Sequence, residues 1–176
     1  MQLVTVMQPY LRLAEQEDAE QIITWVNDPL VTGRSEKYPV SLTELKERLS
    51  TWSEGRNDWV CVIIEDNSIV GLCGLHKIDW TRQNARLSIL IRKEKQGQGI
   101  GTIAINELLR IGFEDLGLHK IYLEALLINP AISLYQRIGF THEGLLREEY
   151  HHHGKHQDMI RMAILRKEWK TTEVGR

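Results

Sequence analysis

The chain has 176 residues, of which 42% are hydrophobic and 26% charged, and its 22 basic and 24 acidic residues give a formal net charge of −2. These values predict one globular domain with a sizeable core and exclude a disordered chain. The near-neutral charge argues against nucleic acid as a partner, because such binders usually carry a strongly basic face. No stretch approaches the roughly 20 apolar residues of a membrane span, and residues 1–10 lack a signal-peptide pattern. We therefore expect a cytoplasmic protein without a membrane partner.

The N-terminal part predicts a strand followed by two helices. Residues 10–13 alternate in polarity as a short strand does, and apolar positions recur at helical spacing from 19 to 26. The sequence Asn27-Asp28-Pro29 is expected to end the first helix. Ser41 begins the second helix, because Glu44 stands at the capping-box position after it.

A β-hairpin is predicted next. Two β-rich segments, 59–65 and 69–78, flank Asp66-Asn67, a dipeptide typical of a tight hairpin turn. Cys61 and Cys73 fall on the two strands of this hairpin. We expect the two thiols either to face each other across the hairpin or to act as two small buried hydrophobes, and two cysteines make no disulfide framework.

The C-terminal part predicts strands and helices around a glycine-rich turn. A strand at 85–92 leads into this turn, and a long helix that ends at Gly117 follows it. A short helix ends at Gly139. The remaining strands are expected at 120–126, 141–150 and 156–165. Residues 1–176 are therefore interpreted as a single α/β (α+β) domain, with a mixed, mostly antiparallel sheet flanked by helices and a core at about 10–167.

The glycine-rich turn has the composition of a phosphate-binding loop. It consists of Gln96, Gly97, Gln98, Gly99, Ile100, Gly101 and Thr102. Glycines let a ligand approach the main chain closely. The first N–H groups of the following helix lack internal partners and lie at the positive end of the helix dipole. These features favour a phosphate or pyrophosphate ligand over a tight turn without a ligand.

Two common phosphate motifs do not match this turn. A Walker A loop ends in Gly-Lys-Ser/Thr, whereas this turn ends in Gly101-Thr102-Ile103. A Rossmann fingerprint needs Gly-x-Gly-x-x-Gly, and the last glycine interval here is one residue too short. The spacing Gln96-x-x-Gly99-x-Gly101 instead resembles the Gln/Arg-x-x-Gly-x-Gly/Ala signature of the GNAT superfamily of N-acetyltransferases. In that family the loop amides hold the pyrophosphate of coenzyme A.

A second segment resembles the same family in the right order along the chain. Residues 119–140 are similar to the family's fifth strand and fourth helix, whose hallmark is Asn…Ala-Ile-x-Leu-Tyr-x-x-x-Gly-Phe. The opening Leu11-Arg12-Leu13 and the tail from Glu143 resemble one subgroup, which holds the ribosomal-protein N-terminal acetyltransferases and the spermidine acetyltransferases. The resemblance covers about residues 10–167, and it implies acetyl-CoA as the acetyl-donor co-substrate.

The resemblance also implies roles for individual residues. The turn 96–102 would hold the pyrophosphate, and the main chain of Ile89, Leu90 and Ile91 would bind the pantetheine arm and the thioester carbonyl. Asn129 would hydrogen-bond the pantetheine arm. Tyr135 maps to the general acid that gives the departing thiolate its proton, which suits a phenol of pKa about 10. The alternative for Tyr135 is a purely structural place in the core.

The chain departs from the family pattern in two places. Between Asn129 and Tyr135 it is one residue shorter, so the loop there must differ locally. Many relatives carry a glutamate as general base in the fourth strand, where this chain has Arg86, which stays protonated and cannot accept a proton. Arg86 would suit an acidic group on the substrate, which argues against a polyamine. Three other residues are alternatives for the base, although each is expected at the surface: Glu124, His76 and Asp79.

Two further groups of residues are interpreted as structural. The histidines His151, His152, His153 and His156 suggest a metal site, but neighbouring residues on a strand point to opposite faces, so no metal is predicted. The tryptophans are expected in the core or along a cleft, and Trp25 and Tyr38 are candidates for the wall of a substrate pocket.

The sequence thus predicts an N-acetyltransferase that moves an acetyl group from acetyl-CoA to a primary amine by direct attack, without a covalent enzyme intermediate. A protein or peptide N-terminus ranks first as substrate, ahead of a small amine such as an aminosugar, an amino acid or a polyamine. Two alternatives stay open: a CoA-sensing module without catalysis, and a nucleotide-binding regulator. Pairing of free sheet edges would give a homodimer.

Overall fold

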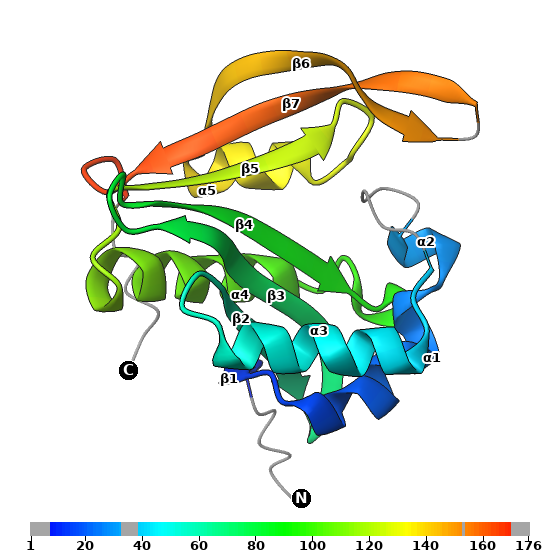
Figure 1. Cartoon of the computed structure of the whole chain (residues 1–176). Helices are drawn as coiled ribbons and strands as arrows, with labels where there is room; N and C mark the ends of the chain where they lie inside the picture. The colour runs from blue at the N-terminus through cyan, green and yellow to red at the C-terminus, as the bar shows by residue number, and fades with distance from the viewer. Residues whose placement is uncertain (1–7, 33–38, 153, 170–176) are drawn as a thin grey trace, which may run out of the picture.

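The computed structural model describes residues 8–32, 39–152 and 154–169, which form one β-sheet with helices packed on it (Figure 1). The strands are β1 (Tyr10–Leu13), β2 (Trp59–Glu65), β3 (Ser68–Asp79), β4 (Asn84–Ile91), β5 (Lys120–Leu126), β6 (Thr141–His152) and β7 (Lys155–Leu165). The helices are α1 (Ala19–Val26), α2 (Pro29–Thr32), α3 (Leu42–Glu54), α4 (Ile100–Arg110) and α5 (Ile132–Ile138), with 3₁₀ turns at Gln16–Asp18 and Lys93–Lys95 and a π-helical turn at Ile111–Asp115.

The sheet has the strand order β1-β2-β3-β4-β5-β7-β6. Neighbouring strands are antiparallel except β4 and β5, which run parallel. The parallel pairing is short, since Asn84, Ala85 and Arg86 pair with β5 and the pairing then ends. Figure 1 shows the consequence: a β1–β4 half and a β5–β7 half that meet at one end and diverge toward the other.

Helices cover both faces of the β1–β4 half. Along β2, Cys61 and Ile63 belong to the core that includes α4, whereas Val60 and Val62 belong to the core that includes α1 and α3. A strand that is buried on both faces carries a continuous apolar run, which is how β2 appears in the sequence. Trp25 lies in the second core with 7% of its surface exposed. Tyr38 lies outside the described residues.

Short-range sequence features placed the element boundaries correctly at three positions. Asp66 and Asn67 have φ angles of 49° and 59°, which a two-residue hairpin turn requires. The Glu44 N–H donates to Ser41 Oγ at 3.1 Å, so the predicted N-cap of α3 is confirmed. Gly139 ends α5 with a φ of 115°.

The predicted end of the first helix at Asn27-Asp28-Pro29 is confirmed, because α1 ends at Val26. The short helix α2, which begins at Pro29, was not predicted; proline is well suited to a first helical position because it needs no N–H partner there. One helical prediction needs correction. The long helix after the glycine turn is α4 followed by the π-helical turn Ile111–Asp115, and Gly117 then follows with a φ of 68°.

The two cysteines face each other across the hairpin, as predicted. Cys61 pairs directly with Cys73 in the β2–β3 register, and both are free and buried. Desolvation raises the pKa of Cys61 to about 11 and that of Cys73 well above its ordinary value. Both thiols therefore stay protonated at neutral pH and pack as small hydrophobes.

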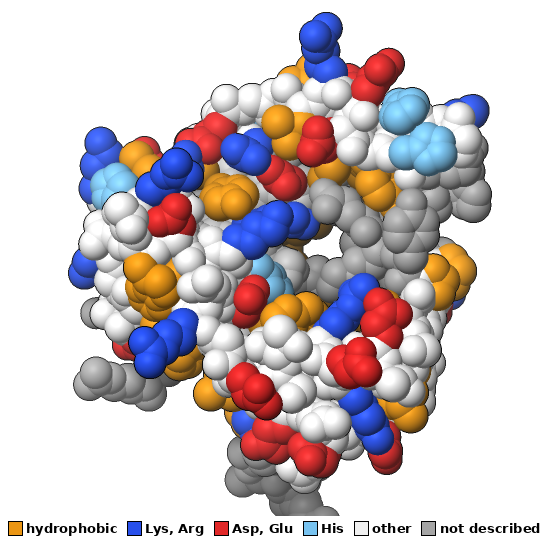
Figure 2. Space-filling model, in the orientation of Figure 1, with side chains coloured by type: hydrophobic (Ala, Val, Ile, Leu, Met, Phe, Trp, Pro, Cys, Tyr) orange, Lys and Arg blue, Asp and Glu red, His pale blue; other side chains and the backbone are white. Residues whose placement is uncertain are grey.

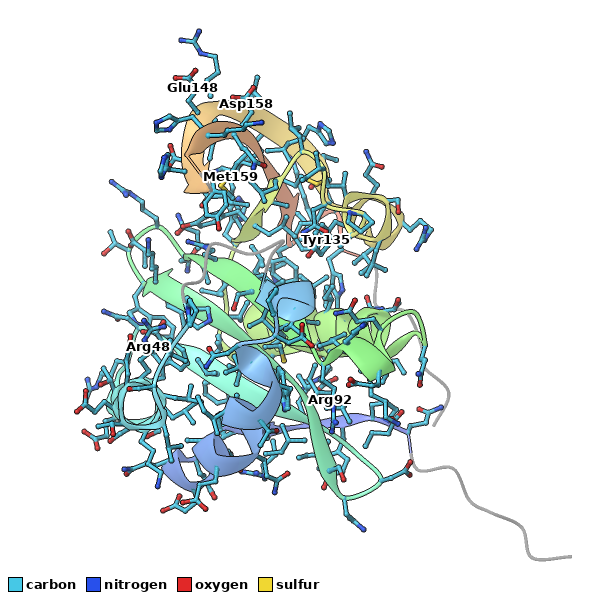
Figure 3. All side chains as sticks on the ribbon, turned by 90° about the vertical axis from the view of Figure 1, so that its right-hand side faces the viewer. Arg48, Arg92, Tyr135, Glu148, Asp158 and Met159 are labelled. Atoms are coloured by element: carbon cyan, nitrogen blue, oxygen red, sulfur yellow. The ribbon has the colours of Figure 1, made fainter. Side chains whose placement is uncertain are left out.

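The β6–β7 hairpin is longer than predicted. The register shifts between Leu146 and Tyr150, and within this bulge Glu148 has a φ of 53°. The Glu148 N–H donates to Asp158 Oδ1 on β7 at 2.7 Å, and Figure 3 shows both residues on the β6–β7 hairpin at the top of the view.

We predict that Gly74→Ala destabilises the protein. A Cβ at position 74 would lie 2.7 Å from the carbonyl oxygen of Trp59 and 3.1 Å from Cα of Val60, so backbone must shift to accommodate it. Overpacking of this kind costs about 1–3 kcal/mol. The change is measured as a lower urea midpoint with an unchanged m-value.

Gly144→Ala is the matched control, because a Cβ at position 144 would meet no atom within 4 Å. Its stability should stay within about 0.5 kcal/mol of the wild type. Equal stability of the two variants would contradict the close packing of β3 against β2.

Candidate active site

The glycine-rich turn presents open main chain at the start of α4. Gly97 and Gly99 have φ angles of 75° and 83°, and Gly99 is the N-cap residue. A Cβ built on either glycine would meet no atom within 4 Å. The N–H groups of Ile100 and Gly101 belong to the first turn of α4, where the helix provides no internal acceptor. The turn therefore has the space and the donors that a pyrophosphate needs.

The two glutamines brace the turn from outside. Gln96 Nε2 donates to the carbonyl oxygen of Ile91 at 2.9 Å, and Gln98 Nε2 donates to that of Glu94 at 2.8 Å. Lys95 Nζ lies 2.6 Å from Glu65 Oε2 on β2. These contacts fix the turn to the end of β4 and to β2.

Peptide groups of β4 point into the gap between the two halves of the sheet. The Arg92 N–H donates to the Val70 carbonyl on β3 at 2.9 Å. Because peptide groups alternate in direction along a strand, those of Leu90 also point to β3, and those of Ile89 and Ile91 point to the gap. The Ile91 carbonyl already accepts from Gln96, so Ile89 is the position we expect to bind a ligand through its main chain, and Leu90 is not.

One cavity of about 480 Å³ connects the glycine turn, the gap and α5. It is lined by Val31, Ile89, Leu90, Ile91, Gln96, Gly97, Gly99, Gly101, Thr102, Ile105, Asn129, Pro130, Ala131, Leu134, Tyr135 and Arg137. All the cofactor and catalytic residues predicted from the sequence lie along it except Gln98 and Ile100. Gln98 turns its side chain to Glu94, and Ile100 is 2% exposed in the core.

Tyr135 closes the α5 side of this cavity. It is 8% exposed and its ring makes an edge contact with Phe140, with 6.1 Å between the ring centroids. Desolvation raises its pKa above the ordinary value, so the phenol keeps its proton at neutral pH. Figure 3 shows Tyr135 between α5 and the β1–β4 half. It belongs both to the core and to the cavity wall, so the two sequence interpretations are compatible.

Asn129 shapes the shortened loop between β5 and α5. Its side-chain oxygen accepts from the Ala131 N–H at 2.9 Å, and its own N–H donates to the Leu126 carbonyl at 2.8 Å. The Ile132 N–H in turn donates to the Asn129 carbonyl at 3.2 Å. The amide therefore folds a tight turn that keeps Asn129 at the cavity despite the missing residue.

Arg86 shares a carboxylate with a second arginine. Its Nη1 lies 3.8 Å from Glu124 Oε2, and Arg161 Nε donates to Glu124 Oε1 at 2.9 Å. The Glu124 side chain is only 12% exposed. The prediction that Glu124 is a surface residue was wrong, because β7 and β4 place an arginine on each side of it. Arg161 also lies over the Tyr122 ring, 5.0 Å from its centroid.

The other two candidates for the general base, Asp79 and His76, lie in different surroundings. Asp79 accepts from the N–H groups of Thr81 and Arg82 at 3.0 and 2.8 Å, so it stabilises the β3–β4 turn. His76 has a side chain that is 18% exposed and was also wrongly expected at the surface. Its ring nitrogens hydrogen-bond to Asp58 and Ser88. The sequence did not predict these contacts, because the three residues lie on separate segments of the chain.

Sequence reasoning also missed the basic residue at the cavity. Arg137 follows Tyr135 by two positions in α5 and is one of the residues that line the cavity. Its place in the helix that carries the family tyrosine was the signal available in the sequence. A guanidinium at a cavity wall is suited to bind a phosphate group.

The histidines of the β6–β7 hairpin do not form a recognisable metal site in the described part of the chain. The rings of His151 and His156 lie 4.9 Å apart across the hairpin, and His153 is outside the described residues. Within the described ranges, His, Cys, Asp and Glu residues form no group of three or more that could hold a metal ion. None of the helices in these ranges has the length and apolarity to cross a membrane.

Comparison with known proteins assigns the chain to a family. The family model of the acetyltransferase (GNAT) domain matches residues 10–141. The chain is 39% identical over 110 residues to the spermidine N(1)-acetyltransferase of Vibrio cholerae, and 32% identical over 109 residues to the putative ribosomal N-acetyltransferase YdaF of Bacillus subtilis. Each match covers 61% of this chain, and they cover 64% and 60% of the two relatives, which is less than two thirds of either one's length.

A solved structure extends the comparison to most of the chain. The spermidine N-acetyltransferase from Vibrio cholerae, crystallised in complex with CoA and spermine, has a TM-score of 0.86 and 33% identity, and the match covers 92% of this chain and 97% of that one. The chain therefore belongs to the GNAT acetyltransferase family. This confirms the resemblance and the fold class, and it agrees with the predicted N-acetyltransferase class and the CoA-based co-substrate.

We predict that Gly99→Asp strongly weakens acetyl-CoA binding. The new side chain would enter the open space at the start of α4 and oppose the pyrophosphate charge. A like-charge contact at this range costs about 4 kcal/mol at an effective dielectric of 20, so Kd should rise by roughly 10²–10³-fold. The change is measured by calorimetric titration.

Gly154→Asp is the control for backbone strain. Gly154 has a φ of 73°, and a Cβ there would likewise meet no atom within 4 Å, but it lies in the β6–β7 turn. This variant should bind acetyl-CoA as the wild type does. Equal binding by the two variants would remove the glycine turn from the cofactor site.

Proposed function

We propose that this protein is an acetyl-CoA-dependent N-acetyltransferase that acetylates a primary amine. One observation carries the proposal: a single cavity joins the open glycine turn, the divergent β4–β5 gap and the Tyr135 phenol. These three parts match the three needs of the reaction, which are a pyrophosphate site, a main-chain site for the pantetheine and thioester, and a proton donor for the thiolate.

The reaction proceeds by direct attack within this cavity. A neutral amine attacks the thioester carbonyl while the peptide group of Ile89 binds the acyl end of the cofactor. Tyr135 donates its proton to the departing sulfur. The raised pKa of Tyr135 supports this role, because it keeps the phenol protonated until the thiolate develops beside it.

The substrate is a primary amine, and two classes have specific support. The relatives named as spermidine acetyltransferases favour a polyamine. The charges around Glu124 favour an amine without further positive charge, because Arg86 and Arg161 already flank this carboxylate. We place a peptide or protein N-terminus first for this reason, and the relative named as a putative ribosomal N-acetyltransferase is compatible with it.

Location and assembly are proposals of the same kind. We infer a cytoplasmic enzyme, and two buried thiols that need no oxidising compartment support this. We infer a homodimer through the sheet edge at β6, where Leu145 is 52% exposed.

Thiol release from acetyl-CoA tests the function directly. Peptide N-termini, aminosugars, amino acids and polyamines are supplied in turn, and CoA formation is followed for each. Turnover with at least one amine is the expected result. Tight acetyl-CoA binding without turnover of any amine would favour a CoA-sensing module, and ATP or NAD binding without competition by CoA would favour a nucleotide-binding regulator.

We predict that Tyr135→Phe lowers kcat on the order of 10²-fold and changes the free energy of acetyl-CoA binding by less than about 1 kcal/mol. The substitution removes the proton donor but keeps the ring against Phe140. Tyr10→Phe, on β1, is the matched control and should keep the wild-type rate. Wild-type turnover by Tyr135→Phe would disprove the general-acid role.

We predict that Arg86→Gln shifts selectivity toward polyamines. The substitution removes one positive charge beside the gap and leaves Glu124 bonded to Arg161. The ratio of kcat/KM for spermidine to that for a peptide N-terminus should rise several-fold, on the order of 1 kcal/mol. The shift should shrink at high salt because exposed charges are screened. An unchanged ratio would mean that Arg86 does not face the substrate.

A further inference from the structure

Three polar side chains form a hydrogen-bonded row on the face of the sheet that carries α1 and α3. His76 Nδ1 lies 2.9 Å from Asp58 Oδ1, and His76 Nε2 lies 2.8 Å from Ser88 Oγ. The Trp52 ring from α3 makes an edge contact with the imidazole, with 5.4 Å between centroids. The side chains of His76 and Asp58 are 18% and 26% exposed, so the row is partly sheltered from water but still reachable.

The β3–β4 register explains how the row forms. His76 pairs with Arg86, and Ser88 pairs with Gly74, so His76 and Ser88 are diagonal neighbours on one face. Gly74 has no side chain, and a Cβ there would lie 2.7 Å from the Trp59 carbonyl oxygen. Position 74, directly opposite Ser88, therefore places no side chain beside the Ser88 hydroxyl.

The hydrogen bonds define the direction of proton movement. An ionised carboxylate accepts only, so Asp58 takes the hydrogen bond from Nδ1–H of His76. That tautomer leaves Nε2 as an acceptor, and the Ser88 hydroxyl donates to it. The row therefore runs from carboxylate to imidazole to hydroxyl. In such a row the imidazole accepts the hydroxyl proton, and the carboxylate stabilises the resulting imidazolium.

Ser88 lies beside the gap between the two halves of the sheet. It stands on β4 two residues past Arg86, where the β4–β5 pairing ends. It precedes Ile89, whose peptide group points into the gap, and it lies about 7 Å along the strand from Leu90, which lines the cavity. Figure 2 looks onto the face that carries α3 and shows an opening near the centre of the molecule, with basic, acidic, histidine and hydrophobic side chains on the part of its rim that the structure describes.

The reaction needs a proton acceptor on this face. The attacking nitrogen must lose a proton as it becomes an amide. Arg86 cannot take that proton, and the Glu124 carboxylate is bonded to Arg161 and faces Arg86. The row from Asp58 to Ser88 contains a base, His76, and a carboxylate, Asp58, that orients it. The row lies on the face of the sheet opposite α5, the helix that carries Tyr135.

We propose that Ser88 and His76 together accept the proton of the attacking amine, with Asp58 as the positioning residue. This inference rests on the proposed acetyltransferase function. The amine nitrogen forms a bond to the acetyl carbon and the carbon–sulfur bond breaks. The nitrogen passes one proton to Ser88 Oγ as the Ser88 proton moves to His76 Nε2, and the sulfur takes its proton from Tyr135. His76 then releases its extra proton to solvent, and the Tyr135 phenolate takes one proton back from solvent.

The test is the pH dependence of kcat at saturating amine and acetyl-CoA. His76 must be neutral to accept a proton, so wild-type kcat should increase as the pH rises through the range in which an imidazole titrates, about pH 6.5. This rising part of the pH profile is the acidic limb. The charged groups beside the imidazole are Asp58, which is bonded to Nδ1, and Arg86, which is the cross-strand partner of His76. Ser88→Ala and His76→Gln should lower kcat at least 10²-fold and abolish the limb, and both should keep the wild-type Kd for acetyl-CoA.

Two further variants test the role of Asp58 and the specificity of the effect. Asp58→Asn should lower kcat and shift the limb, since the amide no longer selects the tautomer. His156→Gln in the β6–β7 hairpin is the matched control and should keep both rate and limb. Turnover at the wild-type rate by Ser88→Ala, or a limb that survives in His76→Gln, would overturn the inference, and so would an acetylated Ser88 on the enzyme. A wild type that turns over no amine would instead count against the proposed function.

Discussion

The divergence of β4 from β5 is the constraint on which the rest of the site depends. Two neighbouring strands in a sheet normally satisfy each other's peptide groups along their whole length. Here the parallel pairing ends at Arg86 and Tyr122, and the peptide group of Ile89 then faces a cavity. The open main chain is maintained because α4 and α5 support the two halves from the same side.

The two halves of the sheet contribute different parts of the site. The β1–β4 half supplies the glycine turn at the end of β4 and the row from Asp58 to Ser88 on its other face. The β5–β7 half supplies Tyr135 and the Glu124–Arg161 pair. Donor and acceptor of protons would thus stand on opposite sides of one gap. The separation lets each keep its own environment: Tyr135 is desolvated by the core, and His76 is polarised by a carboxylate.

The features that could be predicted from the sequence are those that depend on neighbouring residues in the chain. The hairpin at Asp66-Asn67, the Ser41 cap and the glycine turn each depend on a few adjacent residues, and each was placed correctly from the sequence. The family resemblance in β4, in the glycine turn and in residues 119–140 also allowed most of the cavity lining to be anticipated. The role of α2 was missed because Pro29 can both end one helix and begin another.

The remaining features depend on contacts between distant segments. The burial of Glu124 follows from β7 lying beside β5, and the link between Asp58, His76 and Ser88 follows from the β3–β4 register. Neither pattern has a fixed spacing in the sequence. Which peptide groups of β4 face the gap likewise depends on pairing with β3, so Leu90 could not be separated from Ile89 in advance.

Calorimetric titration of the purified protein with acetyl-CoA, and separately with CoA, ATP and NAD, is the decisive test of the cofactor site. We expect saturable binding of acetyl-CoA and CoA with one site per chain, and no comparable binding of ATP or NAD. If the folded protein bound no acetyl-CoA, the open turn, the gap and the cavity would serve another ligand and the assignment of the cofactor site would be wrong.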